Sequence, residues 1–161
     1  MNPSVSLRPV EVGDLPHVFA HQLDPEATRL AAFPARDWEA FYSHWMTNII
    51  GRPTALSYAI LWGDRVAGHI GAWTDVGSHE RLVGYWLGRE FWNQGIASTA
   101  LGLFLSVEST RPLHARVAQH NLGSIRVLEK AGFVRVGEDA FAAPDGTPGA
   151  EYIYRLSTPI A

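Results

Sequence analysis

The stretch GREFWNQGIAS, residues 88–98, joins a β-rich run that ends at Leu87 to an apolar helical run that begins near Ile96. A glycine at position 95 lets the backbone come close to a ligand, and the first amides of a helix have no partner within it. The amides of residues 94–97 are therefore expected to face an anion such as a phosphate. The loop has neither the Gly-Lys-Ser or Gly-Lys-Thr ending of a Walker loop nor the three glycines of a dinucleotide fingerprint. On its own, the pattern fits an ordinary strand-to-helix turn as well.

Toward the N-terminus, the period of the apolar residues predicts helices first and strands next. The expected elements are a strand over 5–10, helices over 15–23 and 37–49, and strands over 55–62, 65–73 and 81–88. Asp14 and Asp37 stand where they can cap the two helices. A two-residue, glycine-first loop at 63–64 favours a tight hairpin turn. One face of the strand after this turn is expected to carry Val66, Ile70 and Ala72.

Toward the C-terminus, helices and strands alternate. The expected elements are a helix over 96–108, a strand over 113–118, a helix over 121–131, and strands over 133–141 and 152–156. Pro112 prevents the first helix from continuing, and Gly132 closes the second where a left-handed cap is easiest. Helices on both sides of a strand meander predict a mixed α/β domain.

Composition restricts the protein to one globular class. The 161 residues suit one domain, and 47% hydrophobic with 18% charged residues exclude a disordered chain. The chain has thirteen basic and sixteen acidic residues and no run of basic residues, which excludes the basic surface typical of nucleic-acid-binding domains. Without cysteine there is no disulfide, thiolate metal site or cysteine nucleophile. No secretory signal is expected in residues 1–15, and the weakly polar stretch Ile96–Val107 is shorter than the roughly 20 residues that span a membrane. We therefore expect a single cytoplasmic domain over 1–161, without membrane attachment.

Three segments carry a family resemblance. Residues 84–101, GYWLGREFWNQGIASTAL, resemble the acetyl-CoA-binding segment of the GNAT acetyltransferase superfamily, in particular its RimJ and RimL branch of ribosomal-protein N-terminal acetyltransferases. Residues 115–133, ARVAQHNLGSIRVLEKAGF, match the other hallmark of that branch. Residues 7–30, LRPVEVGDLPHVFAHQLDPEATRL, are similar to its first strand and helix. The segments follow in the same order as in the family and span nearly the whole chain.

The resemblance implies an α/β (α+β) fold, with a mostly antiparallel central sheet flanked by helices. The strands over 81–87 and 113–118, the fourth and fifth of the sheet, run parallel but splay apart, and the pantetheine of acetyl-CoA enters the gap. The backbone expected to pair with pantetheine is that of Trp86, Leu87 and Gly88. The loop expected to hold the pyrophosphate comprises Asn93, Gln94, Gly95, Ile96, Ala97 and Ser98. In the branch, position 93 is often glycine.

The resemblance also suggests catalytic residues. The tyrosine that often serves as the acid in the superfamily is absent, because Leu128 occupies its position. In the branch, a serine three residues after the motif's asparagine is the candidate donor to the sulfur, and here that residue is Ser124. Asn121 is expected to hold the cofactor through its amide, and the alternative for this pair is a helix cap with its first-turn hydroxyl. Arg126 and Lys130 share a helical face that suits the 3′-phosphate of the nucleotide or plain solvent exposure.

The general base is not assigned by the sequence. Leu82 stands where some members of the branch have glutamate, and the nearby candidates are His69, His79 and Glu80. No metal site is expected, since the pair His17 and His21 lacks the glutamate of a zinc motif and a third ligand. Trp38, Trp45 and Trp73 are expected either in the core or in an acceptor pocket.

The predicted function is N-acetylation with acetyl-CoA as co-substrate, by direct transfer in a ternary complex. The expected partner is an amine acceptor, either a peptide N-terminus or a small molecule, and the low charge and many aromatic residues permit a homodimer. A non-catalytic acyl-CoA-binding or sensing domain is the alternative, because Leu82 and Leu128 replace acid-base groups of relatives. A structural protein with a vestigial pocket is a third interpretation.

Overall fold

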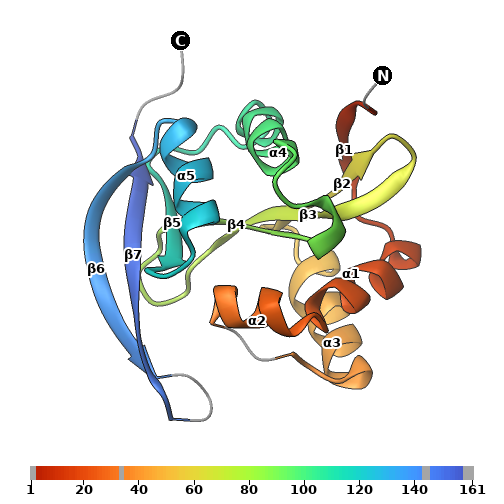
Figure 1. The fold of residues 1–161 in the computed structure, drawn as a ribbon, viewed down its shortest axis with the longest axis horizontal. Helices are drawn as coiled ribbons and strands as arrows, with labels where there is room; N and C mark the ends of the chain where they lie inside the picture. The colour runs from red at the N-terminus through yellow and green to blue at the C-terminus, as the bar shows by residue number, and fades with distance from the viewer. Residues whose placement is uncertain (1–2, 33–34, 143–145, 158–161) are drawn as a thin grey trace.

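A mixed seven-stranded sheet runs through the computed structural model, which describes residues 3–32, 35–142 and 146–157 (Figure 1). Its strands lie in the order β1-β2-β3-β4-β5-β7-β6. Their bounds are Val5–Pro9 (β1), Leu56–Trp62 (β2), Arg65–Thr74 (β3), Arg81–Leu87 (β4), Leu113–Ala118 (β5), Val134–Ala142 (β6) and Pro148–Leu156 (β7). The predicted strands are all present, although β7 begins already at Pro148 rather than at residue 152.

The strands β4 and β5 form the one parallel pair among the described strands. They pair only at their first residues, Arg81 with Leu113 and Leu82 with His114. Beyond these residues the two strands diverge, and Figure 1 shows β4 running away from β5 beneath α4 (Ile96–Leu105). The expected splay is therefore confirmed, and the resulting V opens toward the carboxyl ends of both strands.

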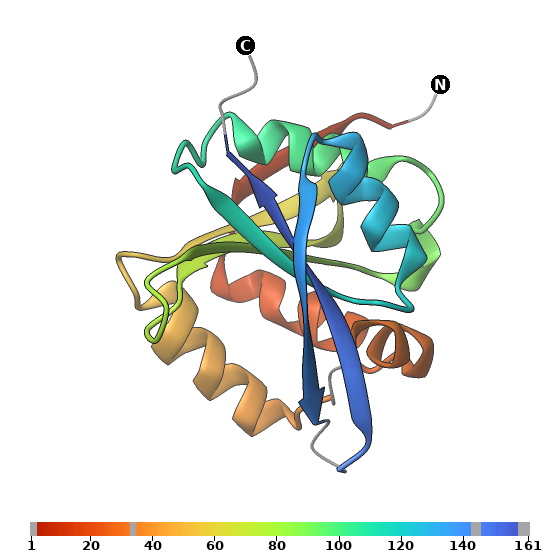
Figure 2. The ribbon, with the colours of Figure 1, turned by 90° about the vertical axis from the view of Figure 1, so that its left-hand side faces the viewer.

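Helices cover both faces of the sheet (Figures 1 and 2). α4 and α5 (Leu122–Lys130) lie on one face. On the other face lie α1 (Leu15–Gln22), α2 (Pro25–Ala31) and α3 (Trp38–His44), and α3 continues into a π-helical turn over Trp45–Ile50. Among the described residues, none of these helices has the length and apolarity needed to cross a bilayer.

The helix α2 was not predicted. Asp24 caps it, because its carboxylate accepts a hydrogen bond from the Ala27 N–H at 3.2 Å, and Pro25 occupies the first position. Both are ordinary start signals. The helix is only seven residues long, so its apolar period was too short to be recognised.

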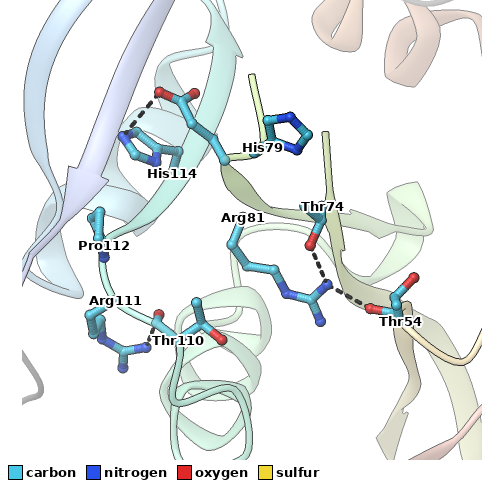
Figure 3. A pocket seen from close by; sticks show the side chains of 9 residues that line it. Thr54, Thr74, His79, Arg81, Thr110, Arg111, Pro112 and His114 are labelled. Atoms are coloured by element: carbon cyan, nitrogen blue, oxygen red, sulfur yellow. Dashed lines mark hydrogen bonds and ion pairs between the residues drawn. The ribbon is translucent and has the colours of Figure 1, made fainter. Parts of the chain in front are cut away.

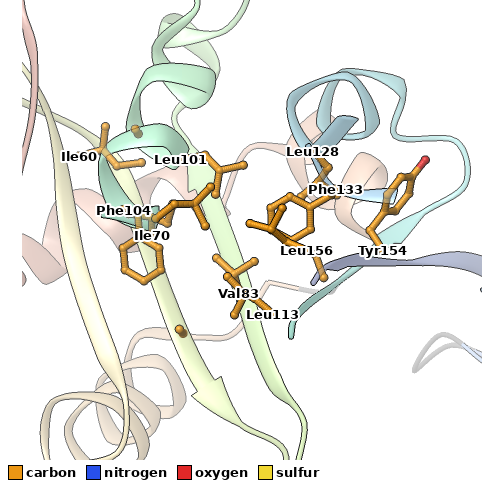
Figure 4. Close-up of a cluster of buried hydrophobic side chains, with 14 of the residues drawn as sticks. Ile60, Ile70, Val83, Leu101, Phe104, Leu113, Leu128, Phe133, Tyr154 and Leu156 are labelled. Carbon is orange, nitrogen blue, oxygen red and sulfur yellow. The ribbon is translucent and has the colours of Figure 1, made fainter. Parts of the chain in front are cut away.

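The main core lies between the sheet and the pair α4 and α5 (Figure 4). Its largest buried side chains include Ile60, Ile70, Leu101, Phe104, Leu128 and Tyr154. A smaller cluster on the other face contains Leu15, Val18, Phe41 and Trp45. The two clusters fix the helices above and below the strands that form the V.

Two details differ from the sequence-based expectation. A bulge between Ile60 and Leu61 pairs Val66 with Leu61, which moves Val66 to the face opposite Ile70. Ala67 joins the main core instead. The helix predicted over 96–108 ends at Leu105, and after the turn the Glu108 carboxylate forms a buried ion pair with Arg81 at 3.0 Å.

Candidate active site

A cavity of about 570 Å³ lies at the open end of the V. Its walls come from the end of β4, the start of α4, the loop after β5, the first turns of α5 and, from the other face of the sheet, α2. The sequence-predicted residues that line it are Trp86, Leu87, Asn93, Gly95, Ile96, Ala97, Ser98, Asn121, Ser124 and Arg126. Gly88, Gln94 and Lys130 lie outside the lining. The structure therefore brings most of the predicted site residues together around one space.

The loop before α4 is shaped to leave backbone amides open. Gly95 has a φ of 76° and Asn93 a φ of 61°, so both adopt the left-handed conformation. Glycine adopts this conformation most readily, and asparagine tolerates it better than most residues. The first backbone hydrogen bond of α4 runs from the Thr99 N–H to the Gly95 carbonyl at 3.1 Å. The amides of residues 96–98 precede this bond and belong to residues that line the cavity.

These features suit a diphosphate. A Cβ added to Gly95 meets nothing within 4 Å, so the space before the helix start is open. Arg126 lines the cavity, and no lining residue in the described part of the chain carries a carboxylate. Backbone amides at a helix start together with a positive side chain favour an anion. The residues present thus fit the pyrophosphate of CoA.

The connection between β4 and the loop is held by the Trp92 side chain, whose indole N–H donates to the Leu87 carbonyl at 3.1 Å. The Gly88 N–H donates to the Ala67 carbonyl at 2.9 Å and is directed to β3. A Cβ at Gly88 comes within 2.6 Å of the His21 ring, so only glycine allows this close packing. Gly88 therefore serves the junction between β4 and α1.

Ser124 makes the most informative contact in the site. The Oγ of Ser124 lies 2.8 Å from the hydroxyl oxygen of Tyr85, and the Tyr85 hydroxyl also lies 3.2 Å from the Ser124 carbonyl, to which it can donate. Burial raises the pKa of Tyr85 to about 12, so its hydroxyl keeps its proton at neutral pH. The Asn121 side chain caps α5 by accepting from the Ser124 N–H at 3.3 Å. Tyr85 lines the cavity and was missed by the sequence analysis.

Two of the three candidate bases lie at the wrong end of the V. His79 and Glu80 line a second cavity, of about 530 Å³, at the closed end, where Glu80 lies 3.8 Å from His114 (Figure 3). Glu80 and Trp86 are six positions apart in the chain, which corresponds to about 20 Å in a strand. Neither side chain therefore reaches the cavity at the open end.

The third candidate, His69, is placed next to the site but not in it. Its ring packs edge-on against Trp45, with 5.0 Å between the ring centroids, and its Nδ1 is buried without a hydrogen-bond partner. Burial lowers the pKa of His69 to about 4, so the ring is neutral at pH 7. His69 pairs across the sheet with Trp86, which lines the cavity. It is a neighbour of the site rather than part of its surface.

The remaining candidates fall outside the cavity. Trp45 is buried in the smaller core, while Trp38 and Trp73 are exposed. His21 packs on Gly88, whereas His17 is exposed. Within the described residues, no three histidine or acidic side chains are arranged to hold a metal ion.

A histidine that the sequence analysis did not consider does line the cavity. His120 is the second residue after β5, which ends at Ala118, and directly precedes Asn121. Its Nε2 lies 2.7 Å from the carbonyl oxygen of Arg29 in α2, so the contact joins the loop after β5 to the opposite wall of the cavity. Its only signal in the sequence was its place immediately before the motif's asparagine.

Comparison with known proteins agrees with this geometry. Residues 4–134 match the model of the acetyltransferase (GNAT) domain family. A protein assigned as a phosphinothricin N-acetyltransferase has 24% identity and a TM-score of 0.82, covering 96% of this chain and 98% of that chain. For a GNAT-family acetyltransferase from Bacillus anthracis the identity is 20% and the TM-score 0.79, with 98% of each chain covered.

A third similar structure is spermidine N-acetyltransferase from Vibrio cholerae in complex with CoA and spermine, with 15% identity, a TM-score of 0.80 and 96% of each chain covered. No curated protein sequence matches this chain. Since the family model covers most of the chain and the sheet, the V and the amide-lined loop are all present, the chain belongs to the GNAT family of acetyltransferases, enzymes that use acetyl-CoA.

Proposed function

We propose that this chain acetylates a primary amine by direct transfer from acetyl-CoA, with both substrates bound together at the open end of the V. One observation carries the proposal: a single cavity has walls on both faces of the sheet. Gly95 and Ser98 line it at the start of α4, and Ala27 and Leu30 line it from α2. One side thus suits a nucleotide and the other an acceptor. The domain is taken as residues 1–161 and its compartment as the cytoplasm.

In this proposal CoA is held mainly by backbone. The amides of residues 93–98 take the pyrophosphate, the end of β4 at Trp86 and Leu87 takes the pantetheine, and Arg126 lies toward the 3′-phosphate. Acetyl-CoA supplies an activated acetyl group as a thioester and is consumed as a substrate. Well-oriented reactants reach effective molarities of about 10⁵–10⁸ M, whereas one acid or base contributes roughly 10²–10⁴ in rate. Positioning by the cavity is therefore the larger contribution.

The hydroxyl of Ser124 is proposed to donate a hydrogen bond to the sulfur as the thiolate leaves, while Tyr85 holds Ser124 in place. A thiol has a reference pKa of about 8.5, far below the pKa of about 12 that burial gives Tyr85. The thiolate is thus too weak a base to remove the Tyr85 proton. The pair acts as a hydrogen-bond donor to developing negative charge, and Asn121 keeps the Ser124 backbone in position.

Two classes of acceptor amine are proposed. The resemblance of residues 84–101 and 115–133 to the RimJ and RimL branch supports a protein N-terminus. The spermidine N-acetyltransferase of similar fold supports a small amine. Because no described lining residue carries a carboxylate, the cavity itself offers no anionic partner to a polycation, which favours the N-terminus.

The test is thiol release from acetyl-CoA over a panel of amines: tetrapeptides beginning with Ala or Ser, spermidine, kanamycin and ethylamine. The chain has no cysteine, so CoA is the only source of thiol in the assay. Amine-dependent release supports the proposed transfer. Binding of CoA without release across the panel supports the non-catalytic acyl-CoA-binding alternative. If the protein neither binds CoA nor releases thiol, both the proposed transfer and the acyl-CoA-binding alternative are contradicted.

A further inference from the structure

We infer that His120 is the general base that removes the proton from the acceptor amine, an inference that rests on the proposed function. His120 lines the cavity between the wall that suits CoA and the wall formed by α2. Its side chain is exposed, so a proton that it takes up can pass to solvent. It directly precedes Asn121, the residue that caps α5 beside Ser124.

The contact with α2 determines which ring nitrogen is basic. A carbonyl oxygen only accepts hydrogen bonds, so Nε2, at 2.7 Å from the Arg29 carbonyl, must carry the hydrogen. A neutral imidazole has one protonated nitrogen, and Nδ1 therefore keeps the lone pair. When Nδ1 takes up a proton, the bond from Nε2 to Arg29 becomes charge-assisted and stronger. The contact thus orients the ring and leaves Nδ1 as the nitrogen that can accept a proton.

Elimination leads to the same residue. The other titratable or charged side chains that line the cavity in the described structure are Tyr85 and Arg126. Tyr85 is protonated at neutral pH because its pKa is raised to about 12 by burial, and an arginine does not lose its proton in proteins. Of the charged neighbours, Arg29 is paired with Glu26 on α2, and Glu138 on β6 accepts a hydrogen bond from Gln119 at 3.1 Å.

The proposed step moves one proton before the transfer begins. An amine attacks a thioester only when it is neutral, so the Nδ1 of His120 takes a proton from the bound ammonium group. The amine nitrogen then forms a bond to the acetyl carbon while the carbon–sulfur bond breaks and its electron pair stays on sulfur. The second proton leaves the nitrogen, and the sulfur gains one from solvent, so the products are an amide and a thiol. His120 returns its proton to water.

The test compares His120→Gln with the wild-type protein. The glutamine amide can still donate to the Arg29 carbonyl but has no basic nitrogen in place of Nδ1. The probes are ethylamine, which is an ammonium ion at pH 7, and 2,2,2-trifluoroethylamine, a weaker base of similar size that is neutral there. We expect kcat/KM for ethylamine to fall about 100-fold and that for trifluoroethylamine to change little. His17→Gln, on the exposed surface of α1, is the matched control and should leave both values unchanged.

Other results overturn the assignment. Equal losses with both amines indicate a structural role, and no loss with ethylamine excludes His120 as the base. Without cofactor, ¹⁵N NMR of histidine-labelled protein should show a His120 ring with hydrogen on Nε2, identified by its loss in His120→Gln, whereas hydrogen on Nδ1 contradicts the inference. A wild-type protein that turns over no amine refutes the proposed function and the base together. Turnover that His120→Gln leaves intact refutes only the base.

Discussion

At the scale of single residues, the role proposed for Ser124 depends on a distant partner, Tyr85. Thirty-nine positions separate the two residues, yet their side-chain oxygens lie 2.8 Å apart. Ser124 lines the cavity while its hydroxyl contacts the hydroxyl of Tyr85, so the direction of the Ser124 hydroxyl depends on Tyr85. A serine held in this way loses less rotational freedom when it donates to the sulfur.

We expect Tyr85→Phe to lower kcat by about 2- to 10-fold, the value of one neutral hydrogen bond. Ser124→Ala should lower kcat by about 10- to 100-fold, because a hydrogen bond to a charged group is stronger. If Tyr85 acts through Ser124, the double variant is no slower than Ser124→Ala alone. Steady-state kinetics and the Kd of CoA by calorimetry separate turnover from affinity, which should stay nearly constant.

Tyr154→Phe is the matched control for this series. Tyr154 is also buried and its hydroxyl donates a hydrogen bond to Glu129 at 3.1 Å, but it lies outside the cavity. Its substitution should leave kcat unchanged. A double variant much slower than Ser124→Ala, or a large loss of CoA affinity in Tyr85→Phe, means that Tyr85 has a different role.

At the scale of elements, the junction between the loop and α4 is predicted to depend on Gly95. Gly95→Ala places an L-residue at a φ of 76°, which costs about 1–2 kcal/mol. The added methyl group also enters the open space before the helix start, so we expect CoA to bind at least about 10-fold more weakly, since 1.4 kcal/mol is tenfold in affinity. Urea unfolding measures the first effect and calorimetry with CoA the second.

Gly102→Ala is the control within the same helix. A Cβ there also meets nothing within 4 Å, and Gly102 lies in the body of α4. Alanine should therefore stabilise the helix by up to about 1 kcal/mol and leave CoA affinity unchanged. Equal CoA affinity in both variants contradicts the proposed role of the α4 start.

The first strand and first helix are joined by an ion pair with a predictable pH dependence. The two terminal guanidinium nitrogens of Arg8, Nη1 and Nη2, each lie 2.7 Å from an oxygen of the Asp14 carboxylate, and the Asp14 side chain is 6% exposed. The hydrogen bond with Arg8 lowers the pKa of Asp14 below its usual value. The pair therefore stabilises the fold fully above the unfolded pKa of about 3.9, and this contribution is lost as the pH falls through the lower folded pKa.

Asp14→Asn should reduce the free energy of unfolding at pH 7 by about 1.5–3 kcal/mol, the value of hydrogen bonds to a charged group. Because the wild-type protein loses the same contribution in acid, the difference between the two proteins should shrink as the pH falls below about 3.9. Urea unfolding at several pH values measures both quantities. A difference that does not change with pH means that the charge of Asp14 is unimportant.

At the scale of the whole molecule, the two cores hold the strands apart at the V. Side chains of β4 pack on both faces of the sheet. Val83 is buried in the main core, while Trp86 pairs across the sheet with His69, whose ring packs against Trp45. A ligand that fills the gap binds only the folded protein. We therefore expect CoA at 100 times its Kd to stabilise the fold by about 2.7 kcal/mol, a rise of about 5–10 °C in Tm.

Differential scanning fluorimetry measures this rise, and adenosine, which lacks the pyrophosphate and the pantetheine, is the control ligand. A shift with CoA but not with adenosine agrees with binding along the V. No shift with CoA supports the structural interpretation with a vestigial pocket. The same protein in a light-scattering experiment tests the homodimer, which stays a prediction.

The local patterns of the sequence determined most of the elements. The alternation of apolar residues located β2 at Leu56–Trp62, and cap residues located the starts of α3 at Asp37 and α5 at Asn121. These signals depend on neighbours within a few positions, so they can be seen in one chain. The parallel, splayed pair of strands followed only from the resemblance of longer segments to a family.

Only the tertiary structure decided which side chains share the cavity. The contact between His120 and Arg29 joins residues 91 positions apart, and such pairing leaves no mark on local periodicity. The same holds for the exclusion of His79 and Glu80, which are near β4 in sequence but at its far end in space. The sequence alone therefore determined the framework and the amide-lined loop, while long-range packing decided which titratable side chains line the cavity.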